Sequence, residues 1–255
     1  NLLRDGVVSV AAGIAQLQEA RRLAGLPPLI VAADQEGGPV AHLSPWLERL
    51  PALSSLVHAA PPETLAARAR LYGERQGAAL AALGVNLNLA PVVDLRPSDA
   101  DSPLDFLSGI GGRAIDDDPA VVTEVARAYV AGLAATGVDA TLKHFPGLGR
   151  VRADTHLRRA SLAATAEDLR GDWQPFRSVG NGSRAAIMLG HVVLPALDPE
   201  HAVSHSRIVV QTVLRGQWGH RGVLITDDLN MGAVYGQGIG RVAAQSLAAG
   251  VDLIL

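Results

Sequence analysis

The sequence predicts one domain of the α/β class, a (β/α)8 barrel of the TIM type that spans residues 1–255. Short apolar runs alternate with helical patterns along the chain, as in folds built from parallel βα units. Polar side chains follow several of these runs, and in a barrel the loops at that end converge on one mouth. An open doubly wound sheet usually carries a glycine-rich phosphate loop, and no GxGxxG follows the first visible strand.

Six strands are expected from the apolar runs. Their hydrophobicity is nearly continuous rather than alternating, which is typical of strands covered on both faces. A closed barrel needs two more strands, so we expect the first and the last to lie outside residues 1–255 or to be poorly marked. The chain is therefore expected to be incomplete at both ends. The expected strands are 29–34, 85–91, 140–144, 185–191, 222–227 and 251–255.

Capping residues mark the helices between these strands. One helix is expected to start with Asp118 as N-cap and Pro119 in its first turn, and to end before Gly137. Another covers about 62–83 and stops at the glycine that follows. Thr165, with acidic residues two and three positions later, predicts an approximate capping box at the start of a third helix.

The composition excludes several classes of protein. With 22 basic and 25 acidic residues, a net charge of −3 leaves no basic stripe for nucleic acid. The absence of cysteine excludes disulfides and thiolate metal sites, and no apolar run approaches the roughly 18 to 20 residues that span a bilayer. No signal peptide is visible, and residue 1 need not be the natural start. We expect a monomer or weak dimer in the cytoplasm or at the cell envelope or exterior, with the cytoplasm favoured.

The segment 143–156, KHFPGLGRVRADTH, concentrates polar groups of several kinds. Lys143 is the only lysine of the chain, and it stands beside His144 at a predicted strand end, ahead of a glycine-rich turn. Asp154 and His156 follow, two positions apart. In an extended segment both side chains point to the same side, where the carboxylate can orient and charge the ring. We interpret this segment as catalytic rather than as an ordinary polar loop.

A second polar cluster lies in the segment 222–231, GVLITDDLNM. Only one of the two adjacent aspartates can point into the barrel mouth; Asp227 is expected to be that carboxylate, and Asp228 can cap the next helix. A carboxylate nucleophile with a proton donor across the site is the arrangement of retaining glycosidases. His156, charged through Asp154, would be that donor in place of the usual second carboxylic acid, and would later act as a base.

The remaining polar groups suit a sugar ring better than an apolar ligand. Lys143, His144 and Arg113 offer hydrogen-bond donors, and Asp34 offers acceptors for vicinal hydroxyls. A divalent metal is the competing use of such groups, but Lys143 would repel a cation beside the first candidate ligand, so neither a metal nor a cofactor is expected. The candidate ligands of that alternative are His144, Asp154, His156, His191 and Asp227.

Seven segments match motifs of one known family. They are DQEGG from Asp34, NLNLAPVVDL from Asn86, IGGR ending at Arg113, KHFPGLG from Lys143, ADTH ending at His156, MLGHVVLPALD from Met188 and ITDDLNM from Ile225. In these segments, which cover nearly the whole chain, the sequence resembles glycoside hydrolase family 3 in its bacterial β-N-acetylhexosaminidase branch.

The resemblance implies a barrel enzyme that releases terminal β-linked N-acetylglucosamine from oligosaccharides or muropeptides of the cell wall. It implies that Asp227 is a nucleophile that forms a covalent glycosyl intermediate. It also implies that Asp154 and His156 are an acid/base dyad on a mobile loop. The expected sugar-binding set is Asp34, Arg113, Lys143 and His144, to which we add His42 and His191.

Several positions depart from the family pattern, and Leu157, Arg158 and Arg159 replace its small polar residues after the dyad. Pro39 and His42 stand where arginines are common, and Leu148 replaces a histidine. His42 can still donate to a hydroxyl, or the pocket can accept a different ring. One rival is therefore another β-glycosidase or a phosphorylase on the same scaffold, because a histidine acid/base lets anionic phosphate approach and Arg150 or Arg152 can assist. The other rival is a catalytically silent sugar-binding protein.

Overall fold

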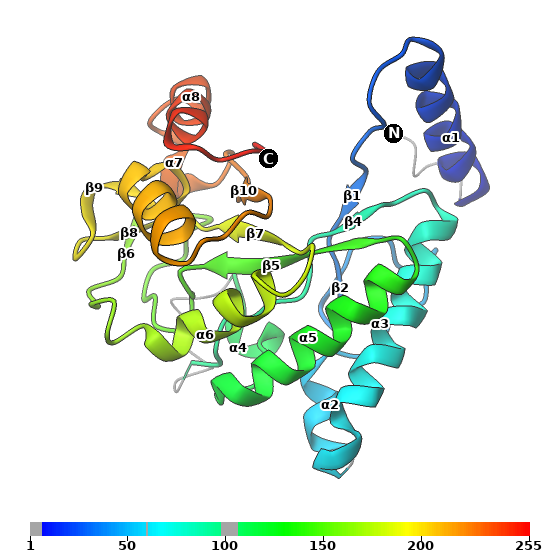
Figure 1. Ribbon diagram of the computed structural model, residues 1–255, viewed down its shortest axis with the longest axis horizontal. Coiled ribbons are helices and arrows are strands. Elements are labelled where there is room, and N and C mark those ends of the chain that lie inside the picture. The colour runs from blue at the N-terminus through cyan, green and yellow to red at the C-terminus, as the bar shows by residue number, and fades with distance from the viewer. Residues whose placement is uncertain (1–6, 60, 98–106) are drawn as a thin grey trace.

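The computed structural model describes residues 7–59, 61–97 and 107–255 (Figure 1). Its main sheet has five parallel strands, and each strand pairs with the next of the set along the chain. An isolated parallel bridge between Ile225 and Leu253 extends the same order by one position. A doubly wound sheet would reverse its strand order, so this order is that of part of a barrel. The strands are β1 (Ala32–Ala33), β4 (Leu87–Asn88), β5 (Asp139–Phe145), β7 (Ala186–Leu189) and β10 (Leu224–Thr226).

The predicted α/β class with a parallel sheet is confirmed, although most observed strands are shorter than expected. Two asparagine side chains take up backbone groups that a longer strand would pair. Asn86 accepts from the N–H of Val31 at 2.8 Å and donates to the carbonyl of Leu29 at 2.9 Å. Asn88 binds both backbone groups of Gln35 in the same way, at 3.1 and 2.9 Å. The described residues do not close the sheet into a ring of eight strands.

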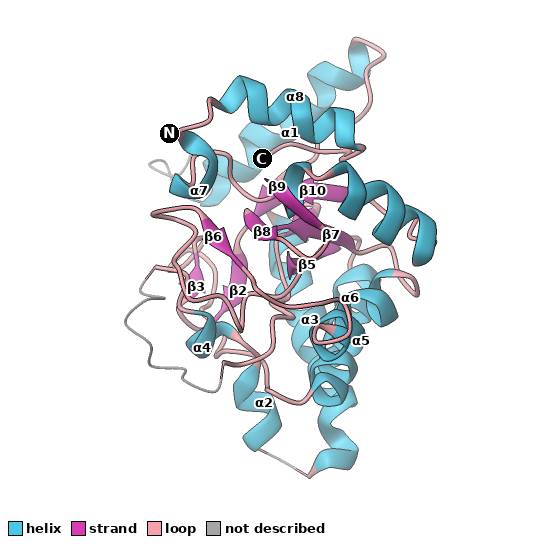
Figure 2. Ribbon diagram, turned by 90° about the vertical axis from the view of Figure 1, so that its left-hand side faces the viewer, coloured by secondary structure: helices cyan, strands magenta, loops and turns pink. Residues whose placement is uncertain are grey.

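The two faces of the sheet differ as the two sides of a barrel wall do. Helices α3, α5 and α6 cover one face, where most of the apolar core lies (Figure 1, Figure 2). The other face carries a small separate apolar cluster, which corresponds to the side chains that fill a barrel interior. That cluster consists of Leu87, Leu89, Ala186, Met188 and Ile225, with Leu253 packed against it.

The predicted helix ends coincide with the capping residues. Helix α5 (Pro119–Ala135) starts after Asp118, whose side chain accepts from the N–H of Ala120 at 2.7 Å. The predicted helix 62–83 is a 3-10 turn, η2 (Pro62–Thr64), that leads directly into α3 (Leu65–Ala82). The predictions for these two helices are confirmed to within a turn.

The predicted capping box forms between Thr165 and Asp168. The N–H of Thr165 donates to the Asp168 carboxylate at 2.8 Å, and the N–H of Asp168 donates to the Thr165 hydroxyl at 3.2 Å. This turn leads into α6 (Arg170–Gly180). The remaining helices, of which the sequence patterns anticipated only one after Asp228, are α1 (Val7–Leu23), α2 (Ser54–His58), α4 (Ile110–Arg113), η4 (Val203–His205), η5 (Ile208–Gln217, with π-type hydrogen bonds), α7 (Gly232–Tyr235) and α8 (Ile239–Ala249).

Two small sheets flank the main one. A hairpin joins β2 (Gln35–Gly37) to β3 (Val40–Ala41), and a three-stranded sheet contains β6 (Ala160–Ser161), β8 (Val192–Leu194) and β9 (Asp198–Ala202). Both are inserted after main-sheet strands, so they enlarge the end of the sheet at which those strands finish. Within the described ranges, no helix is long and apolar enough to cross a membrane.

Candidate active site

A cavity of about 700 Å³ lies at the carboxyl ends of the main-sheet strands. The carboxyl ends of parallel strands lie at one edge of a sheet, so residues in the last part of β5 and just after β1 and β10 meet there. Seven of the predicted site residues line the cavity; Asp154 lies behind His156, and His191 is buried elsewhere. The polar lining consists of Asp34, His42, Arg113, Lys143, His144, His156, Asp227 and Asp228, and the apolar lining includes Val40, Leu43, Leu89, Met188 and Met231.

Lys143 and Arg113 are held together by a carboxylate that the sequence patterns did not assign to the site. The Glu36 carboxylate accepts from Arg113 at 2.7 and 3.0 Å and pairs with the Lys143 ammonium at 2.7 Å. Burial raises the pKa of Glu36, but the charges of Lys143 and Arg113 outweigh it and bring the pKa down to about 2. Lys143 also donates to Asp34 at 2.5 Å. The Asp34 side chain remains 29% exposed, so it can still accept from a ligand.

The ring of His144 is fixed by a second buried carboxylate, Asp94. The Nδ1 atom of His144 lies 2.7 Å from Asp94 Oδ2, and the His144 backbone N–H lies 3.2 Å from both Asp94 oxygens. A guanidinium nitrogen of Arg113 lies 3.5 Å from His144 Nε2. Arginine can only donate, so this contact assigns the Nδ1 hydrogen to the bond with Asp94 and leaves Nε2 as an acceptor.

The Asp154–His156 pair forms a hydrogen-bonded dyad. Asp154 Oδ1 lies 3.0 Å from His156 Nδ1 and also accepts from the His156 backbone N–H at 2.9 Å. Its other oxygen accepts from the N–H of Leu107 at 2.7 Å, and the hydroxyl of Ser108 lies 3.3 Å from both Asp154 Oδ1 and His156 Nδ1. Burial raises the pKa of Asp154, but these hydrogen bonds and His156 outweigh it and the net pKa is lowered. Asp154 is thus held as a carboxylate.

The dyad segment also contacts the residues that follow the predicted nucleophile. The N–H of Gly232 donates to the carbonyl of His156 at 2.8 Å, and the N–H of Ala233 donates to the carbonyl of Thr155 at 3.0 Å. Added carbon at Gly232 would meet the carbonyl oxygen of Leu157 at 2.4 Å, so this approach requires glycine. The imidazole of His156 is 41% exposed and lines the cavity.

Asp227 directly follows β10 and faces the cavity as a half-buried carboxylate. Its Oδ1 accepts from the N–H of Asp228 at 2.9 Å. Burial raises the pKa of Asp227, but the nearby His144 and His191 rings, that hydrogen bond and the Lys143 ammonium outweigh burial, and the net pKa is lowered. Asp228 caps the turn before α7, where its carboxylate accepts from the backbone and side-chain nitrogens of Asn230, both at 2.8 Å.

His191 does not lie where a sugar-binding residue was expected. Its side chain is buried, with 1% exposure, and it is not among the residues that line the cavity. Nδ1 lies 2.8 Å from the Ser204 hydroxyl and Nε2 lies 3.0 Å from the backbone carbonyl of Asp228. The histidine supports the loop that carries the aspartates instead of reaching into the cavity.

The positions that depart from the family pattern are placed as follows. His42, on the turn after β3, is exposed and lines the cavity, and its backbone N–H donates to the carbonyl of Asp34 at 3.1 Å. Leu148 is buried, and its N–H donates to Asp94 at 2.8 Å. Pro39 lies in the turn between β2 and β3. Of the three, only His42 meets the cavity.

Sequence reasoning missed Glu36, Asp94 and Ser108 as members of the site. Glu36 stands two positions after Asp34, a spacing that in an extended segment puts both carboxylates on one side. Asp94 follows an apolar stretch, as Asp34 and Asp227 do, and that signal was available. Ser108 has no sequence signal. No group of three or more histidine or acidic side chains in the part of the chain that the structure describes is arranged to hold a metal ion.

Residues 6–255 match the family model of the glycosyl hydrolase family 3 N-terminal domain. Similar curated proteins are named β-hexosaminidase. One from Xanthomonas campestris is 40% identical over 247 residues, which cover 95% of this chain and 72% of that protein. One from Xylella fastidiosa is 39% identical over 250 residues, which cover 96% of this chain and 71% of that protein.

Solved structures of the same family superpose closely on this chain. A family 3 β-N-acetylglucosaminidase from Paenibacillus has a TM-score of 0.89 at 33% identity, and the match covers 98% of this chain but only 46% of that one. NagZ from Neisseria gonorrhoeae in complex with N-trifluoroacetyl-D-glucosamine has a TM-score of 0.84 at 31% identity, with 98% of this chain and 70% of that chain covered.

Proposed function

This chain belongs to glycosyl hydrolase family 3, and from that membership we propose that it hydrolyses terminal β-linked N-acetylglucosamine with retention of configuration. The names of its relatives support the sugar, and the N-acetylglucosamine analogue bound by the Neisseria relative supports it further. Fragments of peptidoglycan are the proposed source of that sugar. We propose that residues 1–255 belong to one catalytic domain, and that strands outside these residues complete an eight-stranded barrel.

In the first step, an Asp227 oxygen forms a bond to the anomeric carbon while the bond from that carbon to the leaving oxygen breaks. The leaving oxygen takes a proton from His156, whose ring Asp154 holds through Nδ1 so that Nε2 can donate. The products are a glycosyl ester on Asp227 and a free alcohol. The lowered pKa of Asp227 supports this role, because the nucleophile must be ionised at neutral pH.

In the second step, water replaces Asp227 at the same carbon. His156, now neutral, takes a proton from the water as it attacks, and Asp227 leaves as a carboxylate. Two displacements at one carbon restore the original configuration. The Asp154 carboxylate stabilises the charged ring in the first step and orients the neutral ring in the second.

The arrangement of Asp34, Lys143, Arg113 and His144 supports sugar binding. Two cations flank the Glu36 carboxylate, and the exposed edge of Asp34 supplies an acceptor beside Lys143. Such a mixture of charged donors and acceptors suits the hydroxyls of a pyranose. His42, exposed at the rim, is proposed to donate to a hydroxyl of the same ring.

One observation carries the proposal: Asp227 and His156 line the same cavity, and their two segments are bonded to each other through Gly232. A fixed connection between the two keeps a carboxylate and a proton donor around one ligand.

The test compares Asp227→Ala with Asp228→Asn on an aryl β-N-acetylglucosaminide. Asp227→Ala should lose at least about 10⁴-fold in kcat, because the other carboxylates that line the cavity are bonded elsewhere, Asp34 to Lys143 and Asp228 to Asn230. Asp228→Asn keeps the oxygen that accepts from Asn230 and should retain most of the activity. A 2-fluoro sugar should label the peptide that contains Asp227. Substantial activity of Asp227→Ala would contradict the assignment, and release of sugar 1-phosphate in phosphate buffer would favour a phosphorylase.

A further inference from the structure

Three buried polar side chains form a chain of hydrogen bonds beneath the loop that carries Asp227. They are His205 and Ser204 in η4, and His191 after β7, with exposures of 4%, 0% and 1%. His205 Nδ1 lies 3.1 Å from the Ser204 oxygen, which lies 2.8 Å from His191 Nδ1. His191 Nε2 then lies 3.0 Å from the Asp228 carbonyl. Buried polar groups so placed are expected to be fully satisfied.

Each hydrogen bond of this series has one possible donor, so all of them run from His205 toward Asp228. A carbonyl oxygen accepts, so His191 Nε2 carries the hydrogen in its bond to Asp228. Burial lowers the pKa of His191 despite the nearby carboxylate of Asp227, which makes the ring neutral and leaves Nδ1 without a hydrogen. The Ser204 hydroxyl therefore donates to His191 Nδ1. Its oxygen in turn accepts from His205 Nδ1.

The chain ends at the carboxylate that we propose as nucleophile. The Asp228 carbonyl accepts from His191 and also from the N–H of Met231 at 3.1 Å, within its own turn. The N–H of Asp228 donates to Asp227 Oδ1. His191 is thus the donor from outside the turn that fixes the residue whose N–H holds the carboxylate.

We propose that His191 is a positioning residue for Asp227, and that Ser204 sets the tautomer with which His191 performs this task. The proposal rests on the proposed function, because it takes Asp227 as the reacting carboxylate. A carboxylate must meet the anomeric carbon within a few tenths of an ångström for efficient attack, so a loop that tilts slightly loses rate more than binding.

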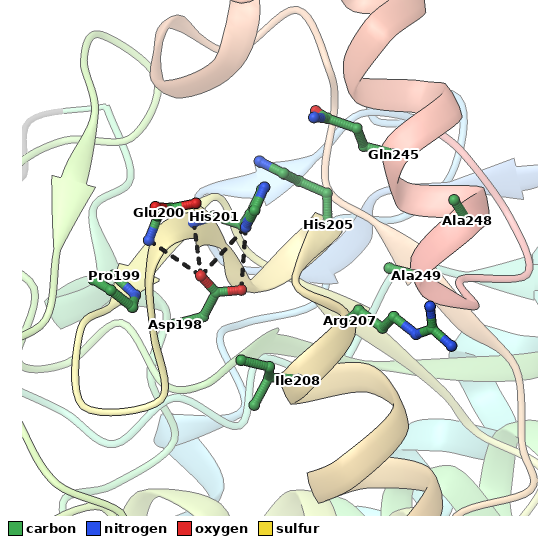
Figure 3. Close-up of a pocket in the computed structure, with 10 residues that line it drawn as sticks. All are labelled: Asp198, Pro199, Glu200, His201, His205, Arg207, Ile208, Gln245, Ala248 and Ala249. Atoms are coloured by element: carbon green, nitrogen blue, oxygen red, sulfur yellow. Dashed lines mark hydrogen bonds and ion pairs between the residues drawn. The ribbon is translucent and has the colours of Figure 1, made fainter.

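The three residues of the hydrogen-bond chain should affect catalysis to different degrees, and His205, at the end far from Asp227, should affect it least. His205 lines a second cavity of about 590 Å³, beside His201, whose ring contacts Asp198 at 3.3 Å (Figure 3). His205 only donates to the Ser204 oxygen, so its loss leaves the bond from Ser204 to His191 in place. The effect on catalysis should therefore fall from His191 through Ser204 to His205.

The experiment measures kcat and KM separately on an aryl β-N-acetylglucosaminide. Ser204→Ala leaves His191 Nδ1 without a donor and should lower kcat about tenfold, the worth of one hydrogen bond, with KM within about twofold. Ser204→Thr keeps the hydroxyl and should restore kcat. His191→Gln should lower kcat about 100-fold, the scale of a displaced reacting group, and His205→Leu should change it less than Ser204→Ala.

Two matched variants separate positioning from stability. Ser246 is equally buried, and its hydroxyl makes one bond, to the carbonyl of Val242 at 2.9 Å. Ser246→Ala should reduce thermal stability like Ser204→Ala but leave kcat unchanged. His220→Gln is the matched control for His191→Gln, because His220 is 1% exposed and its ring bonds Asn181. It should reduce thermal stability but leave kcat unchanged. Equal kcat values for Ser204→Ala and Ser246→Ala would overturn the proposal.

A measurement that needs no substrate distinguishes this proposal from the proposed function. Nitrogen NMR of labelled histidine should show His191 neutral with its hydrogen on Nε2 in the wild-type protein. In Ser204→Ala that tautomer preference should weaken. A hydrogen on His191 Nδ1, or a charged ring at neutral pH, would overturn the inference even if the enzyme is active. Failure of the wild-type protein to cleave any β-N-acetylglucosaminide would instead remove the proposed function and leave the tautomer result standing.

Discussion

Glu36 lies between Lys143 and Arg113 and bonds to both, so it decides how the two cations of the site are placed. Without it their like charges would repel, Arg113 would lose the carboxylate that it bonds, and Lys143 would keep only Asp34. Removing one partner of a buried ion pair usually costs more than the pair contributes, because the other charge stays buried. Asp34, which contacts only Lys143 of the two cations, is the carboxylate that remains free to bind a ligand.

His156 should matter most for substrates with poor leaving groups. Replacing it by glutamine removes the proton donor, so cleavage of an alkyl β-N-acetylglucosaminide should fall by about 10² to 10⁴. A dinitrophenyl glycoside needs no protonation, and formation of its glycosyl ester should fall far less. Values of kcat/KM across a series of leaving groups check this expectation, because they report the steps up to ester formation and not the later step in which His156 acts as a base. Equal losses for good and poor leaving groups would contradict the acid role.

At the scale of single residues, the sequence predicted the groups that recur in recognisable spacings. Asp154 with His156, and Asp227 at a strand end, could be read directly from the pattern. The partners Asp94 and Glu36 were not assigned, although Asp94 follows an apolar stretch and Glu36 stands two positions after Asp34, because neither signal tells which side chain the carboxylate binds. His191 shows the reverse case, since a histidine after a buried strand was expected in the cavity and lies under the loop.

At the scale of elements, two glycines lie where α3 and α5 cross in close contact. A Cβ added to Gly132 would lie 2.2 Å from the carbonyl oxygen of Arg70, and one added to Gly73 would lie 2.3 Å from that of Tyr129. Both clashes are with backbone, which cannot move without separating the helices. The two glycines therefore set the distance between α3 and α5.

Gly132→Ala should destabilise the protein by about 1–3 kcal/mol, the usual cost of overpacking. Gly240→Ala is the matched control, because Gly240 also lies in a helix but has nothing within 4 Å of an added Cβ. It should be neutral or stabilise by up to about 1 kcal/mol through helix propensity. Urea unfolding of both variants measures the difference. An unchanged midpoint for Gly132→Ala would show that the helices can separate at no cost.

The helices that the sequence predicted were those with capping residues close to their ends. Asp118 forms the expected cap, and Thr165 and Asp168 form the expected pair of bonds in the turn before α6, because such contacts depend on residues that are near in sequence. Helix α8 was missed: its N-cap is Gly238 and no side chain makes a cap hydrogen bond there. Strand lengths were overestimated because Asn86 binds the backbone of an earlier segment, a contact across 55 residues that no local pattern records.

At the scale of the whole molecule, several buried groups give stability the same dependence on pH. Burial, with His191 and His201 nearby, lowers the pKa of His205 to about 4 from an ordinary 6.5. The unfolded chain therefore takes up this proton at a higher pH than the folded one. The contribution is complete above pH 6.5 and is lost as the pH falls from there to about 4. Glu36, with its pKa lowered from 4.5 to about 2, adds a second loss between those values.

The free energy of unfolding should therefore decrease steadily from about pH 7 to about pH 3. Asp172 has the opposite effect, because burial raises its pKa and the folded protein therefore takes up this proton before the unfolded chain does. The groups with lowered pKa, among them His205 and Glu36, outnumber it. Urea unfolding across this range checks the slope. His205→Leu should flatten the part between pH 6.5 and about 4, whereas Ser246→Ala, which removes no titratable group, should lower stability equally at every pH. A profile of His205→Leu parallel to the wild type would contradict the assignment.

The sequential order of the parallel strands could be anticipated from the alternation of apolar runs and helices. Whether the sheet closes into a barrel could not be anticipated in this way, because closure depends on which strands pair at the two edges of the sheet. The small sheets β2–β3 and β6–β8–β9 were not anticipated either, since strands of two to five residues carry too short a pattern. They are inserted between main-sheet strands, and Asp34, His42 and His191 lie at their borders.

The position of Lys143 also provides a natural chemical label for the opening of the site. Lys143 carries the only side-chain amine of the chain. It is 2% exposed, and its ammonium pairs with the carboxylates of Asp34 and Glu36. Acylating reagents that modify lysine should therefore leave the side chains of the folded molecule untouched. When the site opens, the reagent can acylate residue 143, so the rate of acylation measures how fast the pocket opens without any engineered label.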